Sequence, residues 1–506
     1  MNKISFKEPG ILLLGLVLSI LSAAICMQIM GQFGIAPNTS LISAVLVMII
    51  ARIPLSFAMR FKNIHRQNLI LSIASSSGFA AANCGFIAIA TVFILGRNDL
   101  ILPMVAGSLI GSLISVFMIG KIFDSRIFPA KGAWPLGTAI ASSLEAGKEG
   151  GKKGIQLLQG LCVGVIASIF NIPAAGIGIA FVANHITMIA LGIGVVIRGY
   201  SHLFIHDFYI QDTYIAQGMM IGAGFIALVQ IFFAIIKGSK KAASEFNIND
   251  KTVVKTLVSS TGLFFIGALF FAFISGILSD MGVFQIILWL LFTSVAAIIV
   301  LILVGTASMH SGWAPTFAVV TIFMTLGIAL GFPPISIAVL VGFLGSTGPC
   351  LADTAIGLKA GWILRGGEDE EYGRKQQIII KMIGVIIGII VALITSVTLL
   401  QAGVRPPMSI FYAISIDMPV DISSLAQLAI WAVPGMILQI AFGQKSVGLM
   451  LAAGLLIQNP IFGITVLCAV IIRIIIGTKH MTIRAPGLIA GDGLFGFVQN
   501  IIRAFL

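Results

Sequence analysis

Apolar runs of about 20 residues recur from one end of the chain to the other, long enough to cross a bilayer as α-helices. Of the 506 residues, 58% are hydrophobic and only 9% are charged. A soluble protein of this size could not bury so much apolar surface, so lipid must serve as the solvent for much of it. The sequence therefore predicts an all-α polytopic membrane protein.

We expect about 14–16 transmembrane helices, some of them broken or re-entrant. The predicted helices cover 10–34, 39–58, 68–95, 99–120, 154–170, 174–197, 214–236, 253–277, 284–304, 308–331, 335–348, 376–400, 425–442, 446–458, 461–476 and 485–503. Glycine pairs four residues apart predict close helix contacts, since small residues let helices approach in lipid. These pairs are Gly107–Gly111, Gly160–Gly164, Gly218–Gly222 and Gly384–Gly388.

The net charge of +12 is distributed in short basic segments between the apolar runs, including 60–66, 121–153, 237–255 and 365–381. Basic residues stay in cytoplasmic loops, which explains this pattern better than nucleic-acid binding does. We therefore predict a multi-pass protein of the inner or plasma membrane with a cytoplasmic N-terminus. Three apolar runs separate the second and third basic segments, and an odd number cannot return the chain to the same side. Either one of these runs does not cross the membrane, or the aromatic stretch 198–213 contains a further crossing, and the path between 153 and 237 stays open.

Two pairs of short motifs occur in the same order in the two halves of the chain. T-A-I-A-S-S-L-E-A-G at 138–147 is similar to T-A-I-G-L-K-A-G at 354–361, and S-G-F-A at 77–80 is similar to S-G-W-A at 311–314. The shared order predicts two parallel internal repeats, 1–237 and 238–506, within one integral membrane domain. Internal repeats and broken helices are typical of secondary transporters.

The segment that contains the first long motif predicts a short helix. Pro135 suits the first turn of a helix and Gly147 its end. About 12 residues reach about 18 Å, roughly half a membrane, which favours a re-entrant helix whose N-terminus could hold an anionic group. We expect the corresponding element of the second half to break at Gly348-Pro349 and to restart near Asp353.

Motifs spread along most of the chain resemble one family in the family's own order. They are R-Q-N-L-I-L-S-I-A-S-S-S-G-F-A-A-A from Arg66, W-P-L-G-T-A from Trp134, L-E-A-G from Leu144, D-T at Asp353 with L-K-A-G-W from Leu358 and R-K-Q-Q from Arg374, and G-L-I-A-G-D-G from Gly487. This set is similar to the oligopeptide transporter (OPT) superfamily, which includes the yellow-stripe metal-chelate transporters. The resemblance implies a multi-span transporter, often with about 16 helices, that moves peptides or metal chelates together with protons. We expect no cofactor. Glu145, where the family often has Lys, and an acidic insert at 366–373 depart from the pattern and leave the substrate open.

Polar residues inside or beside apolar runs are the candidates for binding substrate. A carboxylate at membrane depth is costly, so Asp353 is either functional or a cap of the restarting helix. The full set of predicted substrate-binding residues is Ser76, Ser77, Asn83, Trp134, Gly137, Thr138, Ser311, Trp313, Asp353 and Lys359.

Four titratable residues are candidates for proton coupling: Asp353, His185, His310 and Glu145. We expect His185 to be buried within the 174–197 run, whereas His310 lies at the start of a span. His202 and His206 lie four residues apart, a spacing that can hold a metal on one helix face. The aromatic residues around them favour an interfacial belt instead.

The function predicted from the sequence is secondary active transport of small peptides, including glutathione-like ones, coupled to protons. The alternative is transport of metal chelates of the siderophore or nicotianamine type. A membrane-embedded enzyme would need catalytic groups, and the sequence contains no nucleophile–base motif and no H-E-x-x-H. No G-x-x-x-x-G-K-[ST] is present to bind ATP, and a channel stays open as a third class. The expected partners are the substrate, protons and lipid, and the sequence is compatible with a homodimer.

Overall fold

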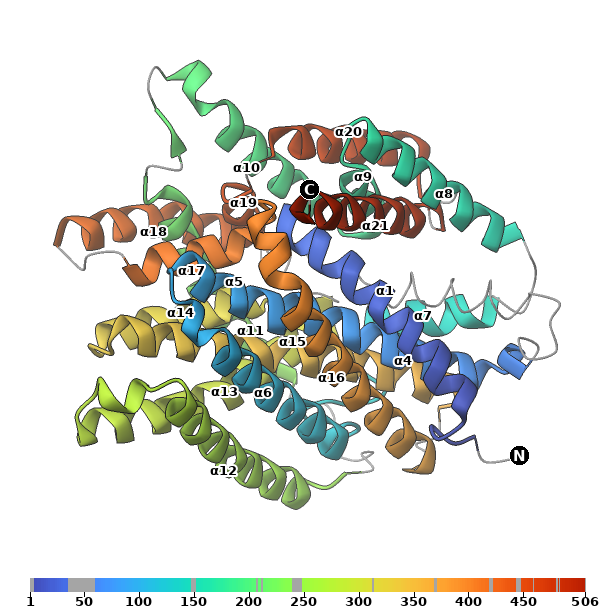
Figure 1. The fold of residues 1–506 in the computed structure, drawn as a ribbon, viewed down its shortest axis with the longest axis horizontal. Helices are drawn as coiled ribbons and strands as arrows, with labels where there is room; N and C mark the ends of the chain where they lie inside the picture. The colour runs from blue at the N-terminus through green and yellow to red at the C-terminus, as the bar shows by residue number, and fades with distance from the viewer. Residues whose placement is uncertain are drawn as a thin grey trace. The chain divides into compact units, whose positions relative to one another are not determined.

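The computed structural model describes residues 4–34, 60–146, 152–205, 208–210, 213–238, 248–311, 314–367, 371–417, 422–442, 447–457, 459–478, 481 and 483–505. In these residues the regular elements are helices and no strand occurs, which confirms the predicted all-α class (Figure 1). In chain order they are α1 (Pro9–Phe33), α4 (Ile64–Phe79), the π-helical segment η2 (Ala80–Phe86), α5 (Ile87–Ile94), α6 (Ile101–Ile122), α7 (Pro135–Ala146), α8 (Lys152–Ile169), α9 (Ala174–Val182), α10 (His185–Phe204), α11 (Ile215–Gly238), α12 (Asp250–Ile274), α13 (Val283–Ser311), α14 (Thr316–Ala329), α15 (Pro334–Leu364), α16 (Glu371–Gln401), α17 (Pro407–Asp417), α18 (Ile422–Phe442), α19 (Val447–Gly454), α20 (Pro460–Ile476) and α21 (Arg484–Phe505). The helix predicted over 39–58 lies outside the described residues.

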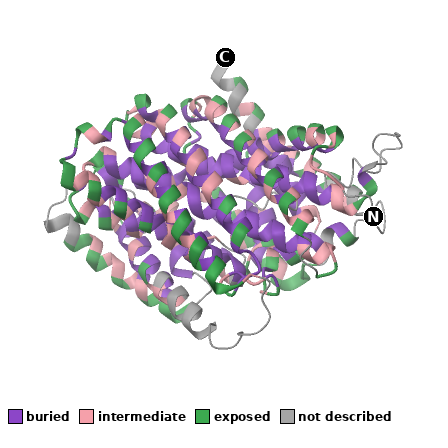
Figure 2. Cartoon of the chain, turned by 90° about the horizontal axis from the view of Figure 1, so that it is seen from below, coloured by how far each residue is buried: buried purple, intermediate pink, exposed green. Residues whose placement is uncertain are grey.

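Within the described residues, 8 spans are long and apolar enough to cross a membrane. They are Pro9–Gln32, Ile64–Ile94, Asn98–Ile122, His185–Leu203, Asp250–Ile274, Val283–Met309, Pro334–Leu364 and Glu371–Gln401, and shorter apolar helices accompany them. Buried and exposed residues lie on different faces of most helices (Figure 2). Many exposed side chains are large and apolar, among them Phe273, Phe284 and Ile394, as expected for faces that contact lipid. The chain is therefore a multi-pass membrane protein.

The chain divides into two units, each assembled from segments distant in sequence. The first unit comprises the described parts of 1–26, 38–154 and 231–396, and the second those of 27–37, 155–230 and 397–506. Each unit therefore draws on both of the predicted repeat halves. The halves themselves, 1–237 and 238–506, stay a prediction.

Helix α15 forms the centre of the first unit, where it packs against α4, α6, α7, α13 and α14. The predicted break at Gly348-Pro349 is wrong, because α15 continues unbroken from Pro334 to Leu364. A proline inside a helix disturbs the backbone bonding of the preceding turn. Here Ser112 Oγ and Cys84 Sγ donate to the carbonyl oxygen of Ser346 at 3.2 and 3.4 Å. Neighbouring helices thus supply donors to the disturbed turn, as membrane helices that contain proline require.

In the second unit, α9 packs against α20 and α21, and α10 packs against α19 and α20. The single helix predicted over 174–197 is wrong, because α9 ends at Val182 and α10 begins at His185. Asn184 separates them: its side chain accepts hydrogen bonds from the backbone N–H groups of Ile186 and Thr187 and so caps α10. The helix α17, over Pro407–Asp417, was not predicted.

All four predicted glycine pairs lie at close helix contacts. A Cβ atom on Gly388 would lie 2.2 Å from the carbonyl oxygen of Ser77, so α16 touches the backbone of α4 at this point. In the other pairs, Gly111 lies against Ser346, Gly164 against Leu488 and Gly222 against Ala432. Within each unit, small residues therefore allow the helices to pack backbone to backbone.

Candidate functional site

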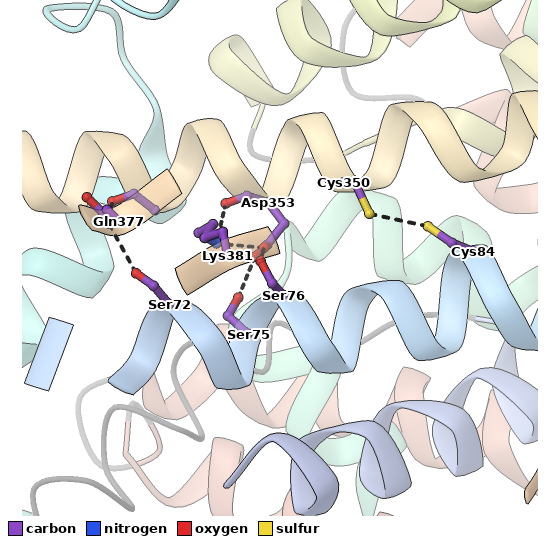
Figure 3. Close-up of polar contacts among 9 residues, drawn as sticks. Ser72, Ser75, Ser76, Cys84, Cys350, Asp353, Gln377 and Lys381 are labelled. Atoms are coloured by element: carbon purple, nitrogen blue, oxygen red, sulfur yellow. Dashed lines mark hydrogen bonds and ion pairs between the residues drawn. The ribbon is translucent and has the colours of Figure 1, made fainter. Parts of the chain in front are cut away.

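Asp353 lies near the middle of α15, only 2% exposed, and faces both α4 and α16 (Figure 3). Its Oδ1 atom accepts a hydrogen bond from Ser75 Oγ, and its Oδ2 atom accepts one from Ser76 Oγ at 2.8 Å. Lys381 Nζ donates to the same Oδ2 at 2.6 Å and to the backbone carbonyl oxygen of Asp353 at 3.0 Å. One carboxylate therefore joins side chains from three helices.

The ion pair between Asp353 and Lys381 is buried on both sides, with side chains 3% and 1% exposed. An isolated charge at this depth would be very costly, whereas a paired and hydrogen-bonded one is tolerated. Two hydroxyl groups satisfy acceptor positions that the lysine leaves open. The pair is neutral overall, but removing either side chain would leave the other charge buried without a counter-ion.

One turn earlier on α16, Gln377 extends the polar contacts between the same three helices. Its Nε2 atom donates to the carbonyl oxygen of Gly357 at 2.6 Å and to Ser72 Oγ at 3.1 Å. Gly357 leaves room for the lysine stem, because a Cβ atom there would lie 2.5 Å from Lys381 Cε. The site is thus a polar layer at the α4–α15–α16 contact, built around one ion pair.

At this contact, helix α4 continues directly into the π-helical segment η2 (Ala80–Phe86). Here Cys84 lies beside Cys350 of α15, with the two sulfur atoms 3.5 Å apart (Figure 3). Single π-helical turns are rare and frequently occur next to functional sites. The π-helical segment η2 therefore lies next to the Asp353 cluster: it follows α4 in the chain, and it contacts α15 through Cys84 and Cys350.

Of the predicted substrate-binding residues, the structure brings Ser76 and Asp353 into direct contact. Ser77 points to another neighbour, since its Oγ donates to the backbone carbonyl oxygen of Ser19 in α1 at 3.0 Å. The Asn83 amide donates to the carbonyl oxygen of Phe79, one turn earlier on its own helix. These side-chain donors are therefore occupied by protein groups.

A second group of predicted residues meets where α7 contacts α15. Helix α7 has the predicted extent, Pro135–Ala146, and a Cβ atom on Gly137 would lie 2.8 Å from the carbonyl oxygen of Ile356. Lys359 Nζ donates to the carbonyl oxygens of Ala130 and Gly132 at 2.7 and 3.2 Å, which anchors the segment before α7.

Trp134, at the start of this contact, is fully buried, and its indole donates to the carbonyl oxygen of Pro129 at 2.9 Å. Thr138 is exposed, and its hydroxyl donates to the carbonyl oxygen of Trp134 at 3.3 Å. Trp313 and the side chain of Ser311 lie outside the described residues. A substrate contact at any of these residues stays a prediction.

Among the other candidates for proton coupling, Glu145 is exposed on α7. The expectation that His185 is buried is wrong: it is exposed in the first turn of α10, because the run that was thought to enclose it ends at Val182. The side chain of His310 lies outside the described residues.

Of the two histidines predicted as a possible metal pair, only His202 lies within the described residues. His202 stacks on Tyr209 with ring centroids 5.5 Å apart, and His206 lies outside the described residues. Where side chains are described, no group of three potential metal ligands occurs.

Lys381 and Gln377 were not among the predicted site residues. The basic segment 365–381 and the predicted helix 376–400 both contain Lys381, and the structure places it more than two turns inside α16. A signal was present in the sequence: Lys381 follows three isoleucines and precedes a long apolar run, so it is an ionisable residue within a membrane helix. Its partner on α15 could not be identified without the fold.

A family model described as OPT oligopeptide transporter protein matches residues 10–196, which include the α4 serines and α7. No curated protein matches the chain. Over residues 10–196, the chain is therefore similar to the OPT oligopeptide transporter family.

Proposed function

We propose that the protein is a secondary active transporter of small peptides, driven by an inward proton gradient across the inner or plasma membrane. The similarity of residues 10–196 to the OPT oligopeptide transporter model supports transport of a small molecule. That the substrate is a peptide and the coupling ion a proton is our proposal. The observation that carries the proton coupling is the buried ion pair between Asp353 and Lys381 at the contact of three helices.

A carboxylate in this position can link proton binding to a change in helix contacts. When Asp353 takes up a proton, its attraction to Lys381 is lost and the ammonium group is left buried without a counter-ion. The contact between α15 and α16 is then weakened, while the serine hydroxyls of α4 can still bond the neutral acid. Proton uptake would thus favour a second arrangement of α16 against α4 and α15, which is the two-state element that coupling requires.

The test is uptake of labelled tri-alanine into proteoliposomes that contain the purified full-length protein. With the exterior acidic, we expect accumulation above the external concentration, and its loss when a protonophore collapses the gradient. Saturable uphill flux also excludes a channel. The proposal fails if tri-alanine does not accumulate, or if accumulation is unchanged by the protonophore. Accumulation of a ferric chelate instead of the peptide would assign the protein to the chelate branch of the family.

A further inference from the structure

The second unit contains a cavity of about 480 Å³ to which none of the predicted site residues contributes. Its walls are formed where helices begin or end: the last turn of α1, the turns between α8 and α9 and between α16 and α17, and the first residues of α20. The middle of α21 closes one side. Helix ends leave backbone groups unpaired, so a cavity surrounded by them can bind polar ligands.

Among the described residues that line this cavity, two are charged, and they have opposite signs: Asp492 on α21 and Arg405 before α17. Asp492 is 6% exposed, and its carboxylate accepts hydrogen bonds from Ser168 Oγ and from the backbone N–H of Ala175, the latter at 2.7 Å. Both donors are neutral. Unlike Asp353, this carboxylate has no cationic partner among the described residues, and it has lone pairs left for a cationic ligand group.

Arg405 provides the opposite charge at the same cavity. In the described part of the chain it has no carboxylate partner. It lies two residues before the start of α17 at Pro407, and the N-terminus of α20 at Asn459-Pro460 also lines the cavity. The partial positive charge of two helix N-termini adds to that of the guanidinium, so this region attracts a carboxylate.

Uncharged amides complete the lining. Gln32, Asn171, Asn459 and Gln499 line the cavity and offer side-chain donors and acceptors suited to peptide groups. Behind the wall, Gln28 is fully buried, and neither polar atom of its amide has a hydrogen-bond partner among the described residues. It packs against Gly496, which itself lines the cavity. Gln28 does not line the cavity, so the four amides that do are the ones able to contact a ligand.

We propose that this cavity binds a small zwitterionic peptide, with the ligand ammonium group at Asp492 and the ligand carboxylate at Arg405. The inference rests on the proposed function in taking a peptide as the substrate. The cavity volume lies within the roughly 300–1,000 Å³ typical of sites for small ligands. A site with one fixed charge of each sign selects a molecule that carries both charges, and it disfavours an analogue that lacks either.

Equilibrium binding of labelled tri-alanine to the full-length protein in lipid nanodiscs tests the assignment, with two analogues as competitors. N-acetyl-tri-alanine lacks the ammonium group, and tri-alanine amide lacks the carboxylate. We expect each to bind the unaltered protein about 10- to 100-fold more weakly than tri-alanine, the effect of losing one charged hydrogen bond. Asp492→Asn should no longer distinguish the acetylated analogue, and Arg405→Gln should no longer distinguish the amide.

The exposed residues Asp417 and Arg126 do not line the cavity, so Asp417→Asn and Arg126→Gln serve as charge-matched controls that keep both discriminations. A purely structural role of Asp492 as a cap of α9 would weaken binding of all three ligands equally, which would overturn the assignment. Full discrimination in both cavity variants would also overturn it, while leaving peptide transport intact. If the unaltered protein neither binds nor accumulates tri-alanine, the proposed function itself has failed.

Discussion

The Lys381→Met substitution tests whether the buried ion pair holds α16 against α15. The charged atoms lie 2.6 Å apart, which corresponds to an attraction of about 6 kcal/mol at an effective dielectric constant of about 20. Much of this offsets the cost of removing both charges from water. Without the lysine, the Asp353 carboxylate keeps the hydroxyls of Ser75 and Ser76 but has no counter-ion. We expect a loss of about 3–5 kcal/mol in stability, the range measured when one member of a buried pair is removed.

The same reasoning predicts the outcome of a double-mutant cycle. Asp353→Asn alone leaves a buried ammonium group and should also destabilise the protein, whereas Asp353→Asn combined with Lys381→Met removes both charges. The double variant should therefore unfold closer to the unaltered protein than either single variant does. Apparent melting temperatures of the four purified proteins in the same detergent measure this. Additive losses, or single variants as stable as the unaltered protein, would refute the ion-pair reasoning.

Two further predictions concern packing around the site. Gly388→Ala should destabilise the protein by about 1–3 kcal/mol, because its Cβ would lie 2.2 Å from the Ser77 carbonyl oxygen. Gly345 has open space around it, so Gly345→Ala should not destabilise the protein. Melting temperatures of the two variants test this difference. Lys359→Met removes the donor that binds two carbonyl oxygens ahead of α7. Amide hydrogen exchange over 130–146 should then be faster, with exchange in α21 unchanged, and equal rates in 130–146 would contradict the anchoring role.

Features that depend on local sequence could be predicted. The apolar runs gave the helical class and most helix positions, and Pro135 located the start of α7. Glycine spacing identified helix contacts, although not which helices meet there. These properties follow from periodicity, span length and the backbone limits of proline and glycine.

Features that depend on tertiary contacts could not be predicted from the sequence. Pro349 indicated a break, but donors from Ser112 and Cys84 support the turn before it. Asp353 was recognised as a buried carboxylate, yet Lys381 follows it by 28 positions, and the sequence does not show that the two side chains meet. The cavity of the second unit is formed by helix ends from four separate parts of the chain and by the middle of α21, and no short motif encodes such a convergence.

The most direct test of proton coupling at Asp353 compares two modes of transport by Asp353→Asn in proteoliposomes. Exchange of labelled tri-alanine against unlabelled tri-alanine at equal pH requires the transport cycle but no net proton movement, whereas accumulation requires the gradient to be coupled. We predict that Asp353→Asn still exchanges peptide and no longer accumulates it when the exterior is acidic. Accumulation by Asp353→Asn at the level of the unaltered protein would contradict the account.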